Sequence, residues 1–220
     1  MLTTLLIRHG ESQSNAGLPT LSPENVVLTD LGIEQAEYIA QYLAYQVSLN
    51  LIVTSSYKRT KQTAVPTKLR FSSVREEEWP VHEFTYLSRE EIRVFSTRWQ
   101  RRPLVDVYWE LCDPELVDGP GSESFEQFIG RVQRVLEQLE TLDEDQTVAV
   151  FSHEQLICAV YWLLTCQPER ITSESMRDFK DFLADHSIPN GGFLRLQRTD
   201  ARYPWQCELM VPLGATAATV

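Results

Sequence analysis

The sequence lacks an apolar run long enough to cross a membrane. Its longest candidate, residues 156–166, falls short of the roughly 18 apolar residues of a membrane span and includes Thr165. The apolar start, residues 1–7, is too short for the core of a signal peptide, and Arg8-His9 interrupts it. We therefore expect a cytoplasmic protein without a membrane partner, in which residues 156–166 form a buried helix.

Cysteine is scarce and has no metal-site spacing. No two of the four cysteines are spaced as CxxC, which argues against a zinc site. Cys158 and Cys166 fall on one expected helix, roughly 12 Å apart along its axis, which is too far for a disulfide. The chain also offers no carboxylate cluster of metal-site type. We therefore expect reduced thiols and no metal.

Basic residues are fewer than acidic residues in this sequence. The chain has 20 Lys and Arg against 31 Asp and Glu, a formal net charge of −11 at pH 7. Nucleic-acid binding requires clustered basic side chains that neutralise phosphates, so we expect no nucleic-acid partner. A local group of arginines can still form a positive pocket in an acidic protein, which leaves a small anionic substrate compatible with this composition.

The order of the expected elements favours an α/β protein. The 220 residues are 43% hydrophobic, enough for one sizeable core, and no linker or internal repeat is evident, so we expect a single domain over residues 1–220. Apolar strands alternate with helices of 3.6-residue periodicity, which predicts a mostly parallel sheet between helices. The expected strands are 3–7, 49–54, 146–151, 193–197 and 206–211, and the expected helices are 30–46, 57–68, 125–139 and 154–165.

The middle of the chain is less regular in pattern. Pro66 is expected to end or bend the helix over 57–68. Residues 78–84 resemble a short edge strand, and residues 88–102 are expected to form an arginine-rich helix. Frequent Pro, Gly and Asp predict an irregular excursion over 103–120.

Two of the four histidines lie at the ends of expected buried strands. His9 follows the strand over 3–7, and Ser152-His153 follows the strand over 146–151. Ligands of such sheets bind at the carboxyl ends of the strands, so we expect His9 and His153 to face one crevice.

Arginines accompany these histidines. Arg8 precedes His9, and Gly10 follows, where glycine would allow a sharp turn of the backbone. Arg59 falls on the first turn of the helix after the strand over 49–54, and its fork would grip an anion at that helix N-terminus. An imidazole beside permanent positive charge is a candidate for phosphoryl chemistry.

These residues form blocks that resemble those of the histidine phosphatase superfamily, which includes the cofactor-dependent phosphoglycerate mutases. The matches extend from about residue 3 to residue 197. They comprise Arg8-His9-Gly10-Glu11-Ser12 with Asn15, Leu28-Thr29-Asp30-Leu31-Gly32 with Gln35-Ala36, Ser55-Ser56 with Arg59-Thr60 and Gln62-Thr63-Ala64, Glu83, Ser152-His153, and Asn190-Gly191.

The resemblance implies a fold, an activity and roles. The fold would be a three-layer α/β/α sandwich of the phosphoglycerate mutase type, with a cap-like insertion at about 84–121. The activity would be hydrolysis of a small phosphorylated substrate without a metal or cofactor. His9 would be the nucleophile that forms a phosphohistidine, and Glu83 the general acid and then base. Arg8, Asn15, Arg59 and His153 would bind the phosphoryl group, and His153 would count among the catalytic residues together with His9 and Glu83.

Two departures keep alternatives open. Mutases of this family usually carry Glu-Arg-x-Tyr-Gly after the acid, whereas residues 83–87 read Glu-Phe-Thr-Tyr-Leu, so water is favoured over a second substrate position as acceptor. Glu154 replaces the glycine that usually follows the second histidine, which favours a third alternative, a catalytically weak phospho-ligand or protein-binding module. The physiological substrate and the formation of a homodimer stay open, as does the role of the cap arginines, which are Arg89, Arg93, Arg98, Arg101 and Arg102.

Overall fold

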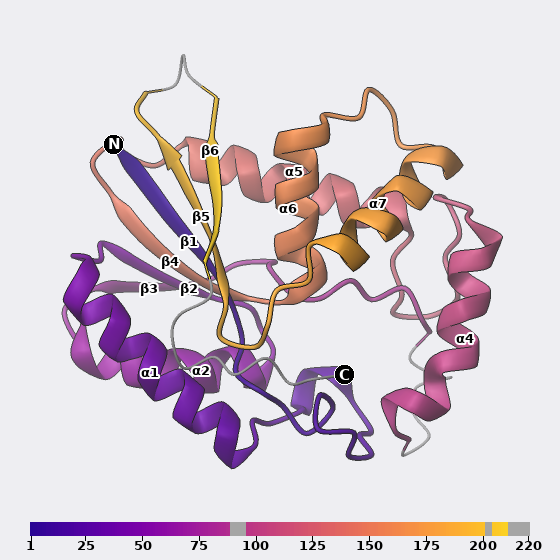
Figure 1. The fold of residues 1–220 in the computed structure, drawn as a ribbon, viewed down its shortest axis with the longest axis horizontal. Coiled ribbons are helices and arrows are strands. Elements are labelled where there is room, and N and C mark those ends of the chain that lie inside the picture. Colours follow the sequence, from indigo (N-terminus) through magenta and orange to yellow (C-terminus); the bar gives the residue numbers. More distant parts are fainter. Residues whose placement is uncertain (89–95, 201–203, 211–220) are drawn as a thin grey trace.

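A six-stranded sheet with strand order β3-β2-β4-β1-β5-β6 forms the centre of the molecule. The computed structural model describes residues 1–88, 96–200 and 204–210 (Figure 1). The four strands from β3 to β1 run parallel, and β5 and β6 are antiparallel to their neighbours. The predicted mostly parallel sheet is thus confirmed. The strands are β1 (Leu2–Arg8), β2 (Leu51–Thr54), β3 (Arg75–Glu78), β4 (Thr147–Ser152), β5 (Phe193–Arg198) and β6 (Gln206–Met210).

Helices cover both faces of the sheet, which confirms the three-layer α/β/α arrangement (Figure 1). Side chains of β1 alternate between two cores, with Leu5 and Ile7 on the side of α1 and α2 and Leu6 on the side of α5 and α6. The helices are α1 (Asp30–Gln46), α2 (Lys58–Arg70), α4 (Arg98–Leu111), α5 (Phe125–Glu140), α6 (Glu154–Cys166) and α7 (Ser173–Asp185), with a short 3₁₀ helix η1 (Pro23–Asn25).

The register of the central strands determines where the site forms. Arg8 at the end of β1 lies opposite Ser152 of β4, and Thr54 at the end of β2 lies opposite Phe151. The carboxyl ends of β1, β4 and β2 therefore meet at one edge, where ligands of parallel sheets bind.

The segment after β2 differs in part from the prediction. Helix α2 does not end at Pro66 but continues to Arg70, and Ala64 and Thr67 on it are fully buried against its neighbours. The other expectation for Pro66, a bend in the helix, stays a prediction. The strand lies at Arg75–Glu78 rather than at 78–84. Its four charged residues show no apolar alternation, and ion pairs from α2 (Lys61–Glu78 at 2.7 Å, Lys68–Glu76 at 2.5 Å) accompany the backbone ladder.

Helix α4 differs from the prediction as well. It begins at Arg98 after a capping box formed by Thr97 and Gln100, and it continues past Pro103 to Leu111, so the expected irregular excursion is wrong over 103–111. Tyr108 and Trp109 are buried in the core and anchor the helix. The expected helix over 88–102 falls partly on residues 89–95, which lie outside the described residues.

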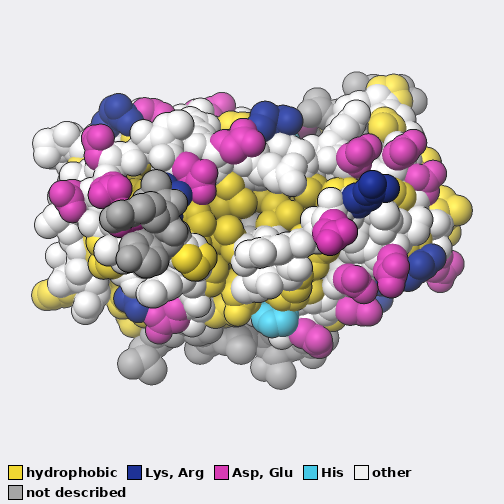
Figure 2. All heavy atoms as spheres, turned by 90° about the horizontal axis from the view of Figure 1, so that it is seen from above, with side chains coloured by type: hydrophobic (Ala, Val, Ile, Leu, Met, Phe, Trp, Pro, Cys, Tyr) yellow, Lys and Arg dark blue, Asp and Glu magenta, His cyan; other side chains and the backbone are white. Residues whose placement is uncertain are grey.

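The surface seen from above agrees with the acidic composition. Figure 2 shows acidic side chains scattered over this face, with few basic ones, around a hollow whose floor is apolar. All four cysteines are free, as expected. None of the helices in the described ranges is long and apolar enough to span a bilayer.

Candidate active site

Close backbone packing fixes the loop that follows β1. A Cβ atom on Gly10 would lie 2.4 Å from the carbonyl oxygen of Gly32, and one on Gly32 would lie 2.0 Å from that of Glu11. Gly10 has no positive φ, so glycine is required here for close approach to α1 rather than for the sharp turn expected from the sequence. The Gly10 amide donates to Thr63 Oγ1 at 3.0 Å.

Polar residues of the first two blocks hold this loop in place. Thr29, the N-cap of α1, donates from its hydroxyl to Glu11 Oε1 at 2.7 Å and accepts from the Gly32 amide. The Glu11 amide donates to Gln35 Oε1 at 2.7 Å. These residues connect the end of β1 to α1, so they hold His9 in place.

The His9 ring is buried, and its tautomer follows from its two partners. Nδ1–H donates to the Gly10 carbonyl at 2.7 Å, and Nε2 accepts from Arg59 Nε at 2.9 Å. Burial, followed by the positive charges of Arg59 and Arg8, holds the pKa of His9 well below its ordinary value. The ring is therefore neutral at pH 7, with a lone pair on Nε2.

His153 lies opposite His9, with ring centroids 5.2 Å apart. It follows β4 and is the N-cap of α6. Nδ1 accepts from Arg59 Nη2 at 2.9 Å, which leaves Nε2–H to donate to Ser55 Oγ at 2.8 Å. Burial and the neighbouring Arg59 hold the pKa of His153 well below its ordinary value too. Ser55 lies in a predicted block, but its role in orienting His153 was not predicted.

Arg59 joins the two histidines. Its third nitrogen, Nη1, donates to the Pro23 carbonyl at 2.6 Å, and its guanidinium lies 4.9 Å from the ring centroid of Tyr57. Burial lowers the pKa of Arg59 to about 10, so it stays charged at pH 7. The predicted placement of Arg59 beside His9 and His153 is what the structure shows.

Glu83 lies in the irregular segment after β3, at the N-terminus of α6. Its Oε1 accepts from the amides of Phe84 at 3.2 Å and Gln155 at 3.1 Å. Burial raises its pKa, Arg59 opposes that rise and the negative charge of Glu154 adds to it. Because Gln155 follows His153 by two residues, the contact with its amide places the Glu83 carboxyl close to His153 in the chain fold.

Glu154 forms an ion pair with Arg8. Oε2 lies 2.9 Å from Arg8 Nη1, and Oε1 accepts from Ser187 Oγ at 2.8 Å. Arg8 Nη1 also donates to the Ile188 carbonyl. The buried Nε of Arg8 has no hydrogen-bond partner within the described ranges. The glutamate that replaces the family's glycine thus lies against an arginine of the site.

Asn15 is held at the edge of the site. Its Oδ1 accepts from the Ser12 hydroxyl at 2.7 Å and from Asn190 Nδ2 at 3.4 Å, and Asn190 also donates to the His9 carbonyl at 3.0 Å. With Oδ1 engaged, the Nδ2 group is the end of the amide that can donate to an anion.

Only some of the cap arginines lie within the described residues. Arg101 donates to the Ser96 carbonyl at 2.6 Å and to Ser14 Oγ at 3.5 Å, next to Asn15. Arg102 pairs with Asp106 on the same helix. Arg89 and Arg93 lie outside the described residues. Over 1–88, 96–200 and 204–210, no three His, Cys, Asp or Glu side chains are grouped as metal ligands.

Comparison with known proteins connects this geometry to a family. The model of the histidine phosphatase superfamily (branch 1) matches residues 4–180. The chain belongs to this superfamily. The resemblance seen in the sequence is thereby confirmed, and the two histidines and Arg59 lie within the matched range.

Phosphatases of the superfamily are among the similar proteins. The adenosylcobalamin/alpha-ribazole phosphatase of Escherichia coli (strain K12) is 28% identical over 183 residues, 80% of this chain and 83% of that protein. The metal-independent phosphoserine phosphatase of Arabidopsis thaliana is 24% identical over 161 residues, 73% and 68% of the two chains. The crystal structure of the alpha-ribazole phosphatase from Shigella flexneri shares the fold, with a TM-score of 0.70 and 23% identity over 95% of each chain.

Proposed function

We propose that this protein is a metal-independent phosphomonoesterase that acts through a phosphohistidine on His9. The observation that carries the proposal is the pair of neutral, buried histidines joined by the single guanidinium of Arg59. A neutral Nε2 is a nucleophile, and the adjacent arginines supply the positive charge that a transferring phosphoryl group requires. Phosphoryl transfer depends chiefly on such positioning and charge stabilisation.

In the first step His9 Nε2 attacks phosphorus. The P–N bond forms as the P–O bond to the alcohol breaks, and the Glu83 carboxyl proton moves to the leaving oxygen. Arg59, which donates to Nε2 in the free protein, redirects its N–H groups to the phosphoryl oxygens. Burial keeps Glu83 protonated at a higher pH than an ordinary glutamate, as a proton donor requires.

In the second step water replaces the histidine. The Glu83 carboxylate accepts a proton from water, the water oxygen bonds to phosphorus, and the P–N electrons return to Nε2. Phosphate leaves and Glu83 is protonated again. Throughout, Nδ1–H of His9 stays on the Gly10 carbonyl, which stabilises the phosphorylated ring. The phosphatase names of the relatives and the sequence of residues 83–87 support water as the acceptor.

The test is an aryl phosphate assay in the presence of a chelator. We expect phosphate release, and an acid-labile, base-stable phosphoryl label on the wild-type chain that His9→Ala lacks. A folded wild-type protein that releases no phosphate would support the binding-module alternative. Activity that requires added bisphosphoglycerate and moves phosphate between positions would support the mutase.

A further inference from the structure

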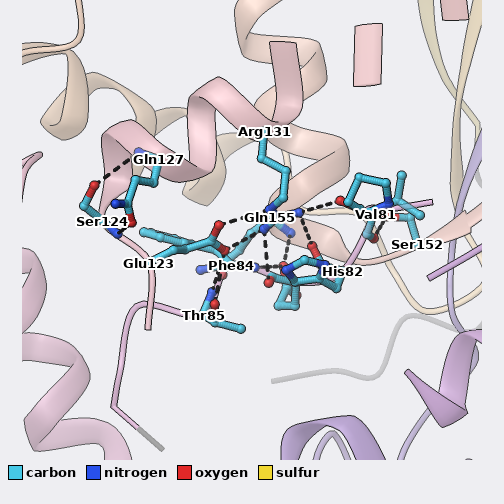
Figure 3. A network of polar contacts seen from close by, with 12 residues as sticks. Val81, His82, Phe84, Thr85, Glu123, Ser124, Gln127, Arg131, Ser152 and Gln155 are labelled. Atoms are coloured by element: carbon cyan, nitrogen blue, oxygen red, sulfur yellow. Dashed lines mark hydrogen bonds and ion pairs between the residues drawn. The ribbon is translucent and has the colours of Figure 1, made fainter. Parts of the chain in front are cut away.

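The segment that carries Glu83 is held by side chains rather than by a β ladder. Arg131 of α5 donates from Nη1 to the carbonyls of Pro80 at 2.8 Å and His82 at 2.9 Å, and from Nη2 to that of Glu83 at 3.4 Å. The Ser152 hydroxyl donates to the carbonyl of Val81 at 2.7 Å. Four consecutive carbonyls, those of residues 80–83, are thus held by two side chains (Figure 3).

Arg131 is itself held by Glu123. Arg131 Nε donates to Glu123 Oε2 at 3.0 Å, and Arg131 Nη2 donates to Glu123 Oε1 at 2.6 Å. This is a bidentate ion pair between largely buried side chains. Glu123 Oε1 also accepts from the Thr85 amide at 3.1 Å, and the Glu123 amide donates to the Thr85 carbonyl at 2.9 Å. Arg131 and Glu123, together called the clamp, therefore hold the backbone on both sides of residues 83–84 (Figure 3).

Apolar anchors already secure this segment to the core. Val81 is fully buried, and Phe84 stacks on Phe128 of α5 with ring centroids 4.4 Å apart. Apolar contacts are non-directional and leave the orientation of the peptide planes between the anchors free. The directional hydrogen bonds of the clamp fix those planes, and with them the direction in which the Glu83 side chain leaves the backbone.

We infer that Arg131 and Glu123 are positioning residues that aim the Glu83 carboxyl at the leaving oxygen. The inference rests on the proposed function of Glu83 as general acid. Neither residue touches the reacting atoms in this arrangement, because Arg131 contacts main-chain carbonyls and Glu123 contacts Arg131 and Thr85. A misdirected acid would slow chiefly those substrates whose leaving group needs a proton.

The test compares kcat/KM for two substrates, an alkyl phosphate and 4-nitrophenyl phosphate, in the absence of metal. The nitrophenolate leaves readily without a proton, whereas an alkoxide does not. Removing a general acid costs about 10²–10⁴-fold, so Glu83→Gln should lose activity in that range on the alkyl ester and less than about tenfold on the nitrophenyl ester.

The clamp variant is Arg131→Met combined with Glu123→Gln, which removes both charges and leaves neither buried alone. We expect its loss to be about 10–100-fold greater on the alkyl than on the nitrophenyl ester, with KM little changed. Arg131→Lys keeps the positive charge but cannot form the bidentate contact with Glu123. It should therefore also lose more activity on the alkyl ester than on the nitrophenyl ester, by a smaller factor than the clamp variant. Arg134→Met, on the exposed face of α5, is the matched control and should leave both rates unchanged.

Each outcome decides the question. Equal losses on both esters in the clamp variant, while Glu83→Gln discriminates between them, would overturn the inference and leave the proposed function intact. If Glu83→Gln also fails to discriminate, Glu83 is not the general acid, and the proposed mechanism falls together with the inference. Should the double variant not fold, Glu123→Gln alone is measured against the same criterion.

Discussion

Replacing Glu154 by glutamine tests the charge balance around Arg8. The substitution removes one negative charge and keeps the length of the side chain. Glutamine retains an oxygen that can accept from Arg8 or Ser187, so the tether between α6 and Arg8 persists in neutral form. The net charge of the phosphate site becomes more positive by one unit.

The size of the effect follows from the geometry of the pair. Glu154 lies 2.9 Å from Nη1 of Arg8, and a phosphoryl group on the other edge of the guanidinium would lie about 6–8 Å from that carboxylate, where unit charges repel by about 0.5–3 kcal/mol for a dielectric constant of 80 to 20. Because the two side chains are 12% and 23% exposed, solvent screens part of this repulsion. We expect about 0.5–1.5 kcal/mol, which is about 2- to 10-fold tighter binding of inorganic phosphate.

The assay is competitive inhibition of aryl phosphate hydrolysis by inorganic phosphate. A second readout is the pH profile, because loss of the Glu154 charge removes one cause of the raised pKa of Glu83 and should move the alkaline limb to lower pH. Glu137→Gln, at an exposed position on α5, makes the same change of charge away from the site. It should alter neither the inhibition by inorganic phosphate nor the pH profile. Phosphate inhibition that is unchanged or weaker in Glu154→Gln would refute this reasoning.

Three further predictions concern the site and its loop. Activity requires neutral His9 and protonated Glu83, so kcat/KM should fall at high pH through the raised pKa of Glu83 and at low pH only below the lowered pKa of His9; a Glu83→Gln profile that keeps the alkaline limb would contradict this assignment. Arg59→Met should raise the pKa of both His9 and His153, followed by NMR titration, and lower kcat by about 10²–10³-fold; unchanged histidine titration would refute the coupling. Gly10→Ala should lower the free energy of unfolding by about 1–3 kcal/mol, since its Cβ would lie 2.4 Å from the Gly32 carbonyl oxygen; denaturant unfolding beside Gly17→Ala, which meets nothing within 4 Å but has a positive φ, separates crowding from backbone strain.

The proximity of the phosphate-binding residues could be predicted from their positions at the ends of parallel strands. Arg8 ends one buried parallel strand, His9 and His153 each directly follow such a strand, and Arg59 lies in the first turn of the helix after a third. The carboxyl ends of such strands share an edge, so the sequence positions alone bring these side chains together. Glu83 could be matched to the family's acid but not placed, because its segment has no periodicity of its own.

The residues that hold the site in place were harder to predict from the sequence. The four charged residues of β3 lack apolar alternation, since α2 rather than a core face pairs with them. Gly10 was predicted to be a turn glycine, because a contact with Gly32 is invisible in a linear pattern. One signal for Arg131 does exist in the sequence: it stands within the apolar stripe of α5, between Phe128 and Val135, where an arginine must find buried partners.

The pairing of β1 with β4 has a consequence for how activity appears during folding. Arg8 and Ser152 are neighbours across these central strands although most of the chain separates them in sequence. A contact of such long range closes a large loop, and proteins dominated by such contacts fold slowly. Recovery of catalysis in a refolding experiment should therefore follow the slowest phase that forms the sheet, and lag behind the appearance of helical signal from α1 and α5, which makes enzymatic turnover a kinetic reporter of the completed topology.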